Sequence, residues 1–252
     1  MTGQKTVKEF IIVGIMMIFI IAALPSGALA QDESEQDESQ LETMSPSRWV
    51  FLAFIGGGQT GGDGQLQYDQ VLDGYEDETP FSLPMGYAAS RGIEVWWFPT
   101  SGRGFLLTGS LLYQTGHSAI KVDDDEDYGA RHLDKKSLRY SLNNILLGLG
   151  YRFLYGEKED YGTNVYAKFG GGGADIVIDD LMNGSGGNAS LDIGANFFHR
   201  FDNDLLIGVQ WDIRMWGMWV TDMEMKYLNT DADFGGGCGG SFLSVIGGWE
   251  LI

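Results

Sequence analysis

The sequence predicts an all-β protein, an eight-stranded antiparallel up-and-down β-barrel that spans a membrane. Two patterns carry this prediction: eight segments in which apolar residues alternate with polar or small ones, and connectors that are alternately long and short. The composition agrees, because 38 of the 252 residues are glycine and each interior glycine weakens a helix by about 1 kcal/mol relative to alanine. The formal net charge of −19 argues against nucleic acid as a partner.

The first 30 residues have the three zones of a secretory signal peptide. Lys5 and Lys8 precede an apolar run from Phe10 to Ala23, and the segment ends in Ala28-Leu29-Ala30, the small-x-small pattern of a cleavage site. The run is shorter than the ~20 residues that a spanning helix needs. We therefore predict a cleaved signal peptide over residues 1–30, with an uncleaved membrane anchor as the alternative.

Residues 31–47 follow as an acidic tail. Positions 31–46 contain six acidic residues and no basic one, and such a composition cannot build a packed core. We expect a disordered periplasmic tail over 31–47, with a docking segment as the alternative, and a barrel over 48–252.

Eight later segments have the period of two that is typical of a strand with one apolar face. The clearest is 204–217, where Leu205, Ile207 and Val209 alternate with Leu206, Gly208 and Gln210. The expected strands lie at 48–57, 86–98, 104–115, 138–154, 163–177, 188–200, 204–217 and 241–251.

The connectors between these segments alternate in length, as they do in outer-membrane barrels, which have short periplasmic turns and long external loops. With the first strand rising from the periplasm, all the long connectors fall outside the cell and all the short ones inside. The long connectors are 58–85, 116–137, 178–187 and 218–240, and the short ones are 99–103, 155–162 and 201–203. The first two long connectors are strongly acidic, so the sequence predicts acidic surface loops.

Aromatic residues cluster near the ends of the expected strands, which is consistent with the aromatic girdles at the two interfaces of a membrane barrel. The group near the periplasmic rim is Trp49, Trp97, Phe98, Phe105, Phe153, Tyr155, Phe198, Phe201 and Trp249. The group near the outer rim is Tyr87, Tyr113, Tyr140, Trp216 and Phe242.

Side chains fill the interior of an eight-stranded barrel, so a wide pore is disfavoured. Strand parity places an interior charge network at Glu94, Arg152, Lys168, Asp192, Asp212, Arg214 and Glu250. By height these charges form a lower group of Glu94, Arg152, Lys168 and Glu250 and an upper group of Asp192, Asp212 and Arg214. Buried charges need partners, so we expect a structural polar core, with a gated ion or proton path as the alternative.

Arg91 fits this pattern poorly, because its parity directs it toward lipid. Either the side chain reaches up to the outer interface, or a bulge near Gly92 changes the parity.

No motif indicates a catalytic, cofactor or metal site. The run Asp123-Asp124-Asp125-Glu126-Asp127 offers oxygen ligands to divalent cations but lacks the spacing of an EF-hand loop. His117 and Ser118 are adjacent, so on a strand they would point to opposite faces. The single cysteine, Cys238, cannot form an intramolecular disulfide, and no base lies near it in sequence.

The stretch LLGLGYRFLYGEKEDYGTNVYAKFGGGGA at 146–174, together with the signal peptide and the eight segments, resembles the small outer-membrane barrels of the OmpA and opacity-protein type. The resemblance covers about residues 48–252 and implies an outer-membrane location. Members of this family usually end in an aromatic residue that the assembly machinery reads, whereas Trp249 lies three residues before the end of this chain.

These observations favour a non-enzymatic protein of the Gram-negative outer membrane with an envelope-structural or surface-interaction role. The expected partners are outer-membrane lipid and lipopolysaccharide, the barrel-assembly machinery, and divalent cations at the acidic loops. The alternatives are a narrow channel for ions or small hydrophobic compounds, a lipid A-modifying enzyme, and a secreted lipocalin-like barrel.

Overall fold

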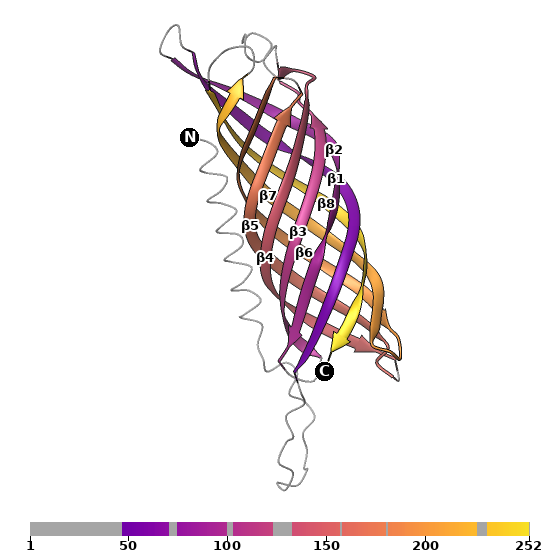
Figure 1. Cartoon of the computed structure of the whole chain (residues 1–252). Coiled ribbons are helices and arrows are strands. Elements are labelled where there is room, and N and C mark those ends of the chain that lie inside the picture. Colours follow the sequence, from indigo (N-terminus) through magenta and orange to yellow (C-terminus); the bar gives the residue numbers. More distant parts are fainter. Residues whose placement is uncertain are drawn as a thin grey trace, which may run out of the picture.

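Eight strands close into one barrel, in which each strand pairs antiparallel with its sequence neighbours and β1 pairs with β8 (Figure 1). The computed structural model describes residues 47–70, 75–99, 103–122, 133–156, 158–179, 181–225 and 231–251. The strands are β1 (Arg48–Gln70), β2 (Tyr75–Phe98), β3 (Gly104–Ala119), β4 (Ser137–Tyr155), β5 (Tyr161–Ile178), β6 (Met182–Arg200), β7 (Leu205–Met225) and β8 (Asp231–Leu251). The predicted eight-stranded up-and-down barrel is confirmed.

The N-terminal predictions lie outside this part of the chain. The signal peptide over 1–30 and the acidic tail, apart from its last residue, fall on residues that the structure does not describe. Among the described residues, no helix combines the length and apolar character needed to cross a membrane.

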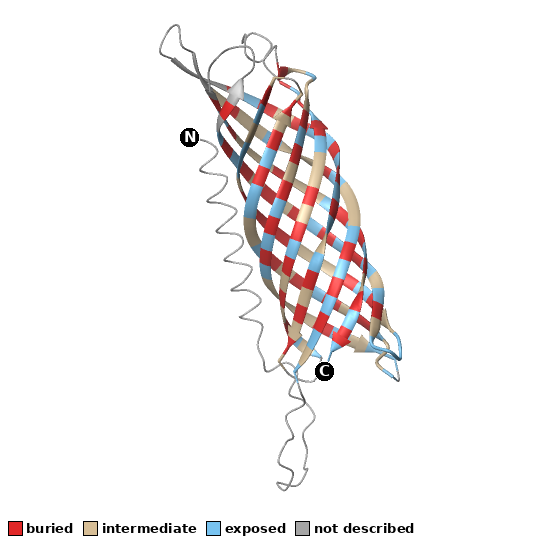
Figure 2. Cartoon of the chain, viewed as in Figure 1, coloured by how far each residue is buried: buried red, intermediate tan, exposed pale blue. Residues whose placement is uncertain are grey.

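The alternation of residue types becomes an alternation of burial along each strand (Figure 2). On β7, Gln210, Asp212 and Arg214 are buried inside the barrel, whereas Trp211 and Ile213 are about half exposed on its outer surface. The same alternation on every strand leaves a polar interior and an apolar outer surface at mid-height, the reverse of a water-soluble barrel.

Most of the predicted long loops are strand instead. β1 continues to Gln70 and β2 begins at Tyr75, and their pairing runs through most of 58–85. β7 and β8 likewise extend through most of 218–240, and β5 and β6 through most of 178–187. The sequence pattern weakens there because glycines and acidic residues interrupt the apolar face, but backbone pairing needs no side chain.

The extended strands lengthen the barrel at the end opposite to Arg48 and Leu251, the first residue of β1 and the last residue of β8. We call the end where β1 begins and β8 ends the lower end, and the opposite end the upper end (Figure 1). Irregular pairing is confined to the upper part, with register shifts at Thr60/Gly62, Asn183/Gly187 and Val220/Met223.

The predicted aromatic girdles are correct only in part. Trp49, Phe105, Phe153, Tyr155 and Trp249 lie exposed on the outer surface near the lower end. Five others point inward instead, because each shares the parity of an interior residue on its strand. These are Phe98 and Phe198 near the lower end and Tyr140, Trp216 and Phe242 higher up.

Arg91 lies on the outer surface, and the pairing on both sides of Gly92 is continuous, so no bulge changes its parity. Its guanidinium lies 5.0 Å from the ring centroid of Tyr113, the residue directly opposite on β3. Of the two explanations that the sequence leaves open, the bulge is therefore excluded.

Candidate functional site

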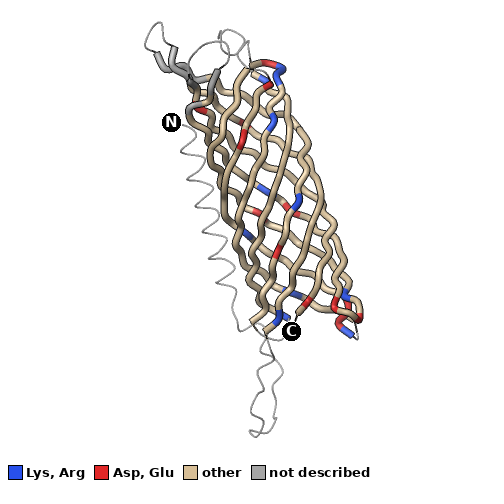
Figure 3. The backbone as a smooth tube through the Cα atoms, viewed as in Figure 1, with Lys and Arg blue, Asp and Glu red and all other residues tan. Residues whose placement is uncertain are grey.

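The structure places all seven residues of the predicted interior charge network inside the barrel, each no more than 3% exposed. Figure 3 shows basic and acidic positions at mid-height as well as at the two ends. The ion pairs divide into a cluster at the lower end and a larger cluster at mid-height, which we call the lower and central charge clusters.

In the lower charge cluster, three arginines surround one glutamate. Glu250 forms ion pairs with Arg152 at 3.2 Å, with Arg48 at 3.0 Å and with Arg200 at 3.7 Å. The Arg152 guanidinium also lies over the ring of Phe98, 3.7 Å from its centroid. Cation–π contacts of this kind strengthen when the ring and the cation are desolvated, so the buried Arg152 side chain is held firmly inside the lower end of the barrel.

The lower part of the central charge cluster is an ion pair between Lys168 and Glu94, with 2.9 Å between Nζ and Oε2. The other carboxylate oxygen of Glu94 accepts hydrogen bonds from Trp96 Nε1 at 2.7 Å and Thr108 Oγ1 at 2.9 Å. Both oxygens of this buried carboxylate are therefore satisfied, which is the condition for tolerating a buried charge.

The upper part of the central charge cluster is centred on Arg214. Its Nε donates to Asp192 Oδ2 at 3.1 Å and its Nη2 donates to Asp212 Oδ2 at 2.9 Å. Asp212 also accepts hydrogen bonds from the Tyr166 hydroxyl at 2.5 Å and from Gln210 Nε2 at 2.9 Å. The Arg214 guanidinium thus joins the neighbouring strands β6 and β7, and its Nη1 also donates to Gln114 Oε1 on β3 at 3.4 Å.

The grouping differs from the one that strand height predicts. Lys168 was expected beside Arg152 and Glu250 in a lower group, but the register places it directly opposite Asp192, which is itself opposite Arg214. The strands of a barrel are staggered, so residues at one height need not be neighbours. Lys168 and Glu94 consequently belong with Arg214 and its two carboxylates.

Sequence reasoning missed several members of the two clusters. Arg48 lies at the first position of β1 and Arg200 at the last position of β6, where the alternation gives no reliable parity. Tyr166 has the same parity as Lys168 and could have been assigned to the interior on that ground. Its aromatic ring gave no sign that its hydroxyl would bond to a charged group.

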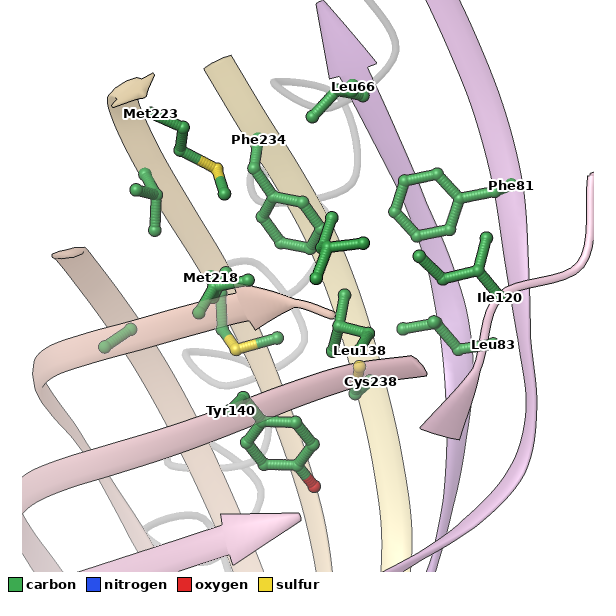
Figure 4. Packing of buried hydrophobic residues seen from close by; sticks show 14 of the residues in the cluster. Leu66, Phe81, Leu83, Ile120, Leu138, Tyr140, Met218, Met223, Phe234 and Cys238 are labelled. Atoms are coloured by element: carbon green, nitrogen blue, oxygen red, sulfur yellow. The ribbon is translucent and has the colours of Figure 1, made fainter. Parts of the chain in front are cut away.

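Above the central charge cluster the interior becomes apolar, which the sequence analysis did not predict. Figure 4 shows side chains from several strands packed against one another, among them Phe81, Phe234, Met218 and Leu138. All are buried, and Cys238 lies among them, 7% exposed. We call this group, with Leu66, Leu83, Ile120, Tyr140, Met223 and their buried neighbours, the upper apolar layer.

The sequence candidates for chemistry are not brought together. Ser118 is buried and its hydroxyl donates to the carbonyl oxygen of Pro84 at 2.5 Å, whereas His117 lies exposed on the other face, beside the ring of Tyr87. Within the described ranges, no three His, Cys, Asp or Glu side chains form a group that could hold a metal ion. The acidic run 123–127 lies outside those ranges.

No protein-family model matches the sequence, and no curated protein sequence matches it either. Solved structures of similar shape include the outer membrane protease OmpT from Escherichia coli, with 10% sequence identity and a TM-score of 0.37, covering 80% of this chain and 96% of that one. The outer membrane protein AlkL in lipid bilayers has 11% identity and a TM-score of 0.36, covering 87% and 97%. The attachment invasion locus protein Ail of Yersinia pestis, in complex with sucrose octasulfate, has 13% identity and a TM-score of 0.29, covering 78% and 99%.

Proposed function

We propose that this protein is a non-enzymatic barrel of the Gram-negative outer membrane, built like the OmpA and opacity-type barrels that its sequence resembles. The band of apolar side chains around its outer surface supports this location. A water-soluble protein would not expose so large an apolar surface. The band includes Phe51, Ile55, Ile93, Leu111, Ile145, Leu147, Val165, Phe169, Val209, Trp211, Ile213, Leu243 and Val245. Lipid and lipopolysaccharide are then its immediate partners.

The role that we propose is anchoring rather than transport. The observation that carries this proposal is the central charge cluster, whose side chains cross the interior at mid-height and are paired and almost fully buried. A polar solute on its way through the barrel would have to break these ion pairs. Breaking a buried pair leaves an uncompensated charge, which costs about 3–5 kcal/mol.

The extension above the apolar band supports a surface role. The upper apolar layer gives the extended strands a packed core of their own, so this part of the barrel holds its shape outside the lipid. We propose that it is a rigid pedestal that holds the upper connections of the barrel away from the membrane, where they contact surface partners. Divalent cations at the acidic run 123–127 remain part of this proposal.

A second candidate function is passage of small hydrophobic compounds. The apolar character of the upper apolar layer favours it over ion conduction, because ions are excluded from apolar surroundings. Its packed side chains would have to move apart to admit such a compound. Such a compound would still meet the central charge cluster, so an exit through the barrel wall would be required above Lys168 and Arg214.

Planar-bilayer recordings on the refolded chain test the anchoring role. We expect no stepwise conductance from protein whose folded state is verified by its altered gel mobility without heating. Reproducible single-channel steps that disappear in the Arg214→Gln variant would contradict the proposal and make the central charge cluster the selectivity site. If the protein does not conduct but vesicles that contain it take up an apolar fluorophore faster than protein-free vesicles do, the second candidate is favoured.

The stability of an Arg91→Leu variant tests where the apolar band ends. We expect Arg91→Leu to change the free energy of unfolding by less than about 1 kcal/mol, because an arginine on the lipid-facing surface costs about 0–1 kcal/mol near the interface and its cation–π contact is worth a similar amount. The measurement is equilibrium unfolding in urea from lipid vesicles.

The matched control for this test is Ile93→Arg, which places the same side chain one outward position further down β2, within the apolar band. We expect that variant to lose more stability than the arginine at position 91 costs, with about 2–4 kcal/mol, the cost at the midplane, as the upper limit. Stabilisation of more than about 2 kcal/mol by Arg91→Leu would show that position 91 itself lies deep in the lipid.

A further inference from the structure

Four neutral polar side chains stand side by side on the interior wall between the two charge clusters. Asn164 on β5 is directly opposite Asn196 on β6, which is opposite Gln210 on β7, which is opposite Ser244 on β8. Each is no more than 2% exposed. The row therefore consists of three amides and one hydroxyl on four adjacent strands.

Charged neighbours fix the orientation of the amides at positions 164 and 210. Asn164 Oδ1 accepts a hydrogen bond from Arg152 Nε at 3.2 Å, and Gln210 Nε2 donates one to Asp212 Oδ2 at 2.9 Å. A guanidinium can only donate and a carboxylate can only accept, so neither amide can be flipped without losing its bond. Asn164 must therefore offer its Nδ2 donors to the row, and Gln210 must offer its Oε1 acceptor.

Five polar atoms of this row have no hydrogen-bond partner among the described residues. They are Asn164 Nδ2, Asn196 Nδ2, Asn196 Oδ1, Gln210 Oε1 and Ser244 Oγ. Buried polar groups in folded proteins nearly always have a partner, which is either protein or ordered water. Other buried atoms without such a partner, among them Ser90 Oγ and Ser110 Oγ, lie elsewhere in the barrel. The five atoms of the row form one candidate site because their residues are directly opposed on four adjacent strands.

The chemistry of the row identifies what it binds. All four side chains are neutral, and the nearest charged groups are already engaged, Arg152 with Glu250 and Asp212 with Arg214. An ion in the row would have no countercharge of its own. Donors and acceptors are mixed along the row, so the bound molecule must both donate and accept, and it must be small enough to fit between adjacent residues of paired strands.

We propose that this row binds a file of internal water molecules that bridges Asn164, Asn196, Gln210 and Ser244 and joins the lower charge cluster to the central one. A water between two neighbouring side chains of the row has at least two polar partners, which is one of the requirements for a buried water. The barrel interior is then hydrated along β5–β8, at the level of this row. This proposal holds whether the barrel anchors or transports.

Water-to-amide cross-relaxation in the refolded, isotope-labelled full chain tests the proposal. We expect cross-peaks between water and the side-chain amide protons of Asn164 and Asn196, with the rotating-frame sign of a bound water rather than that of proton exchange. Asn188 is the matched control within the same protein: it is 3% exposed, but its Nδ2 donates to the Gly173 carbonyl at 2.8 Å and its Oδ1 accepts from Ser190 at 3.2 Å.

Cross-peaks at Asn164 and Asn196 with none at Asn188 would support the water file. Their absence at Asn164 and Asn196 would overturn it in favour of a direct amide-to-amide ladder. Equal cross-peaks at all three asparagines would also overturn it, because they would indicate a generally wet interior. The measurement uses the unmodified chain, so its outcome does not depend on whether a variant folds.

Discussion

Replacing Lys168 by methionine is expected to lower the free energy of unfolding by about 3–5 kcal/mol, the usual cost of removing one partner of a buried ion pair. The side chains of Lys168 and Glu94 are each 1% exposed and 2.9 Å apart, so the remaining carboxylate would have no access to solvent. Asp192 lies directly opposite Lys168, which adds a second negative charge that the ammonium no longer offsets. Equilibrium unfolding in urea, from vesicles or detergent, measures the loss.

The double variant Lys168→Met/Glu94→Gln is the control that separates charge from shape. Glutamine keeps the oxygen that accepts from Trp96 and Thr108 but carries no charge, so we expect it to recover most of the lost stability. Replacement of a whole buried pair by neutral residues is often close to neutral. A double variant as unstable as Lys168→Met alone would mean that the lysine acts by filling space and not by its charge.

The topology could be predicted from the sequence because the period of two is a local property. On β7, successive residues such as Trp211 and Asp212 point to opposite faces, and their types indicate which face is which without any knowledge of the neighbouring strand. The upper halves of β1 and β8 could not be recognised in this way. There, residues such as Gly61, Gly62 and Gly239 pair through their backbones, and a glycine shows no preference for either face.

The contents of the interior follow from parity, but the contacts inside it do not. Parity alone is enough to direct Lys168, Asp192 and Arg214 inward. That Asp192 lies directly opposite both of the other two is known only once the register between strands is known. Register in a barrel depends on stagger around the whole ring, and a single strand contains no information on it. The upper apolar layer was missed for a simpler reason: Phe234 and Met218 lie in a stretch taken for a loop.

Gly248→Ala is expected to be strongly destabilising, because this glycine lies at the seam where β8 closes the barrel onto β1. Gly248 is opposite Leu52, and a Cβ at this position would overlap the carbonyl oxygen of Phe51 and lie 2.8 Å from Leu52 Cα. Both are backbone atoms, so relief requires moving the strand. We expect a loss of about 3 kcal/mol or more, at or above the upper end of overpacking costs, and a reduced folded fraction on unheated gels.

The neighbouring residue provides the matched control. Gly247 lies on the outer surface, and a Cβ there would meet only the Leu206 carbonyl oxygen at 3.8 Å, an ordinary contact. Gly247→Ala should therefore fold as well as the parent and gain about 0.4–1 kcal/mol, because alanine restricts the unfolded chain. If both variants folded equally well, the seam would have to tolerate a shift of β8 against β1. The ion pair of Glu250 with Arg48 across the same seam would then also have to be mobile, so the closed ring would be weakest at this edge.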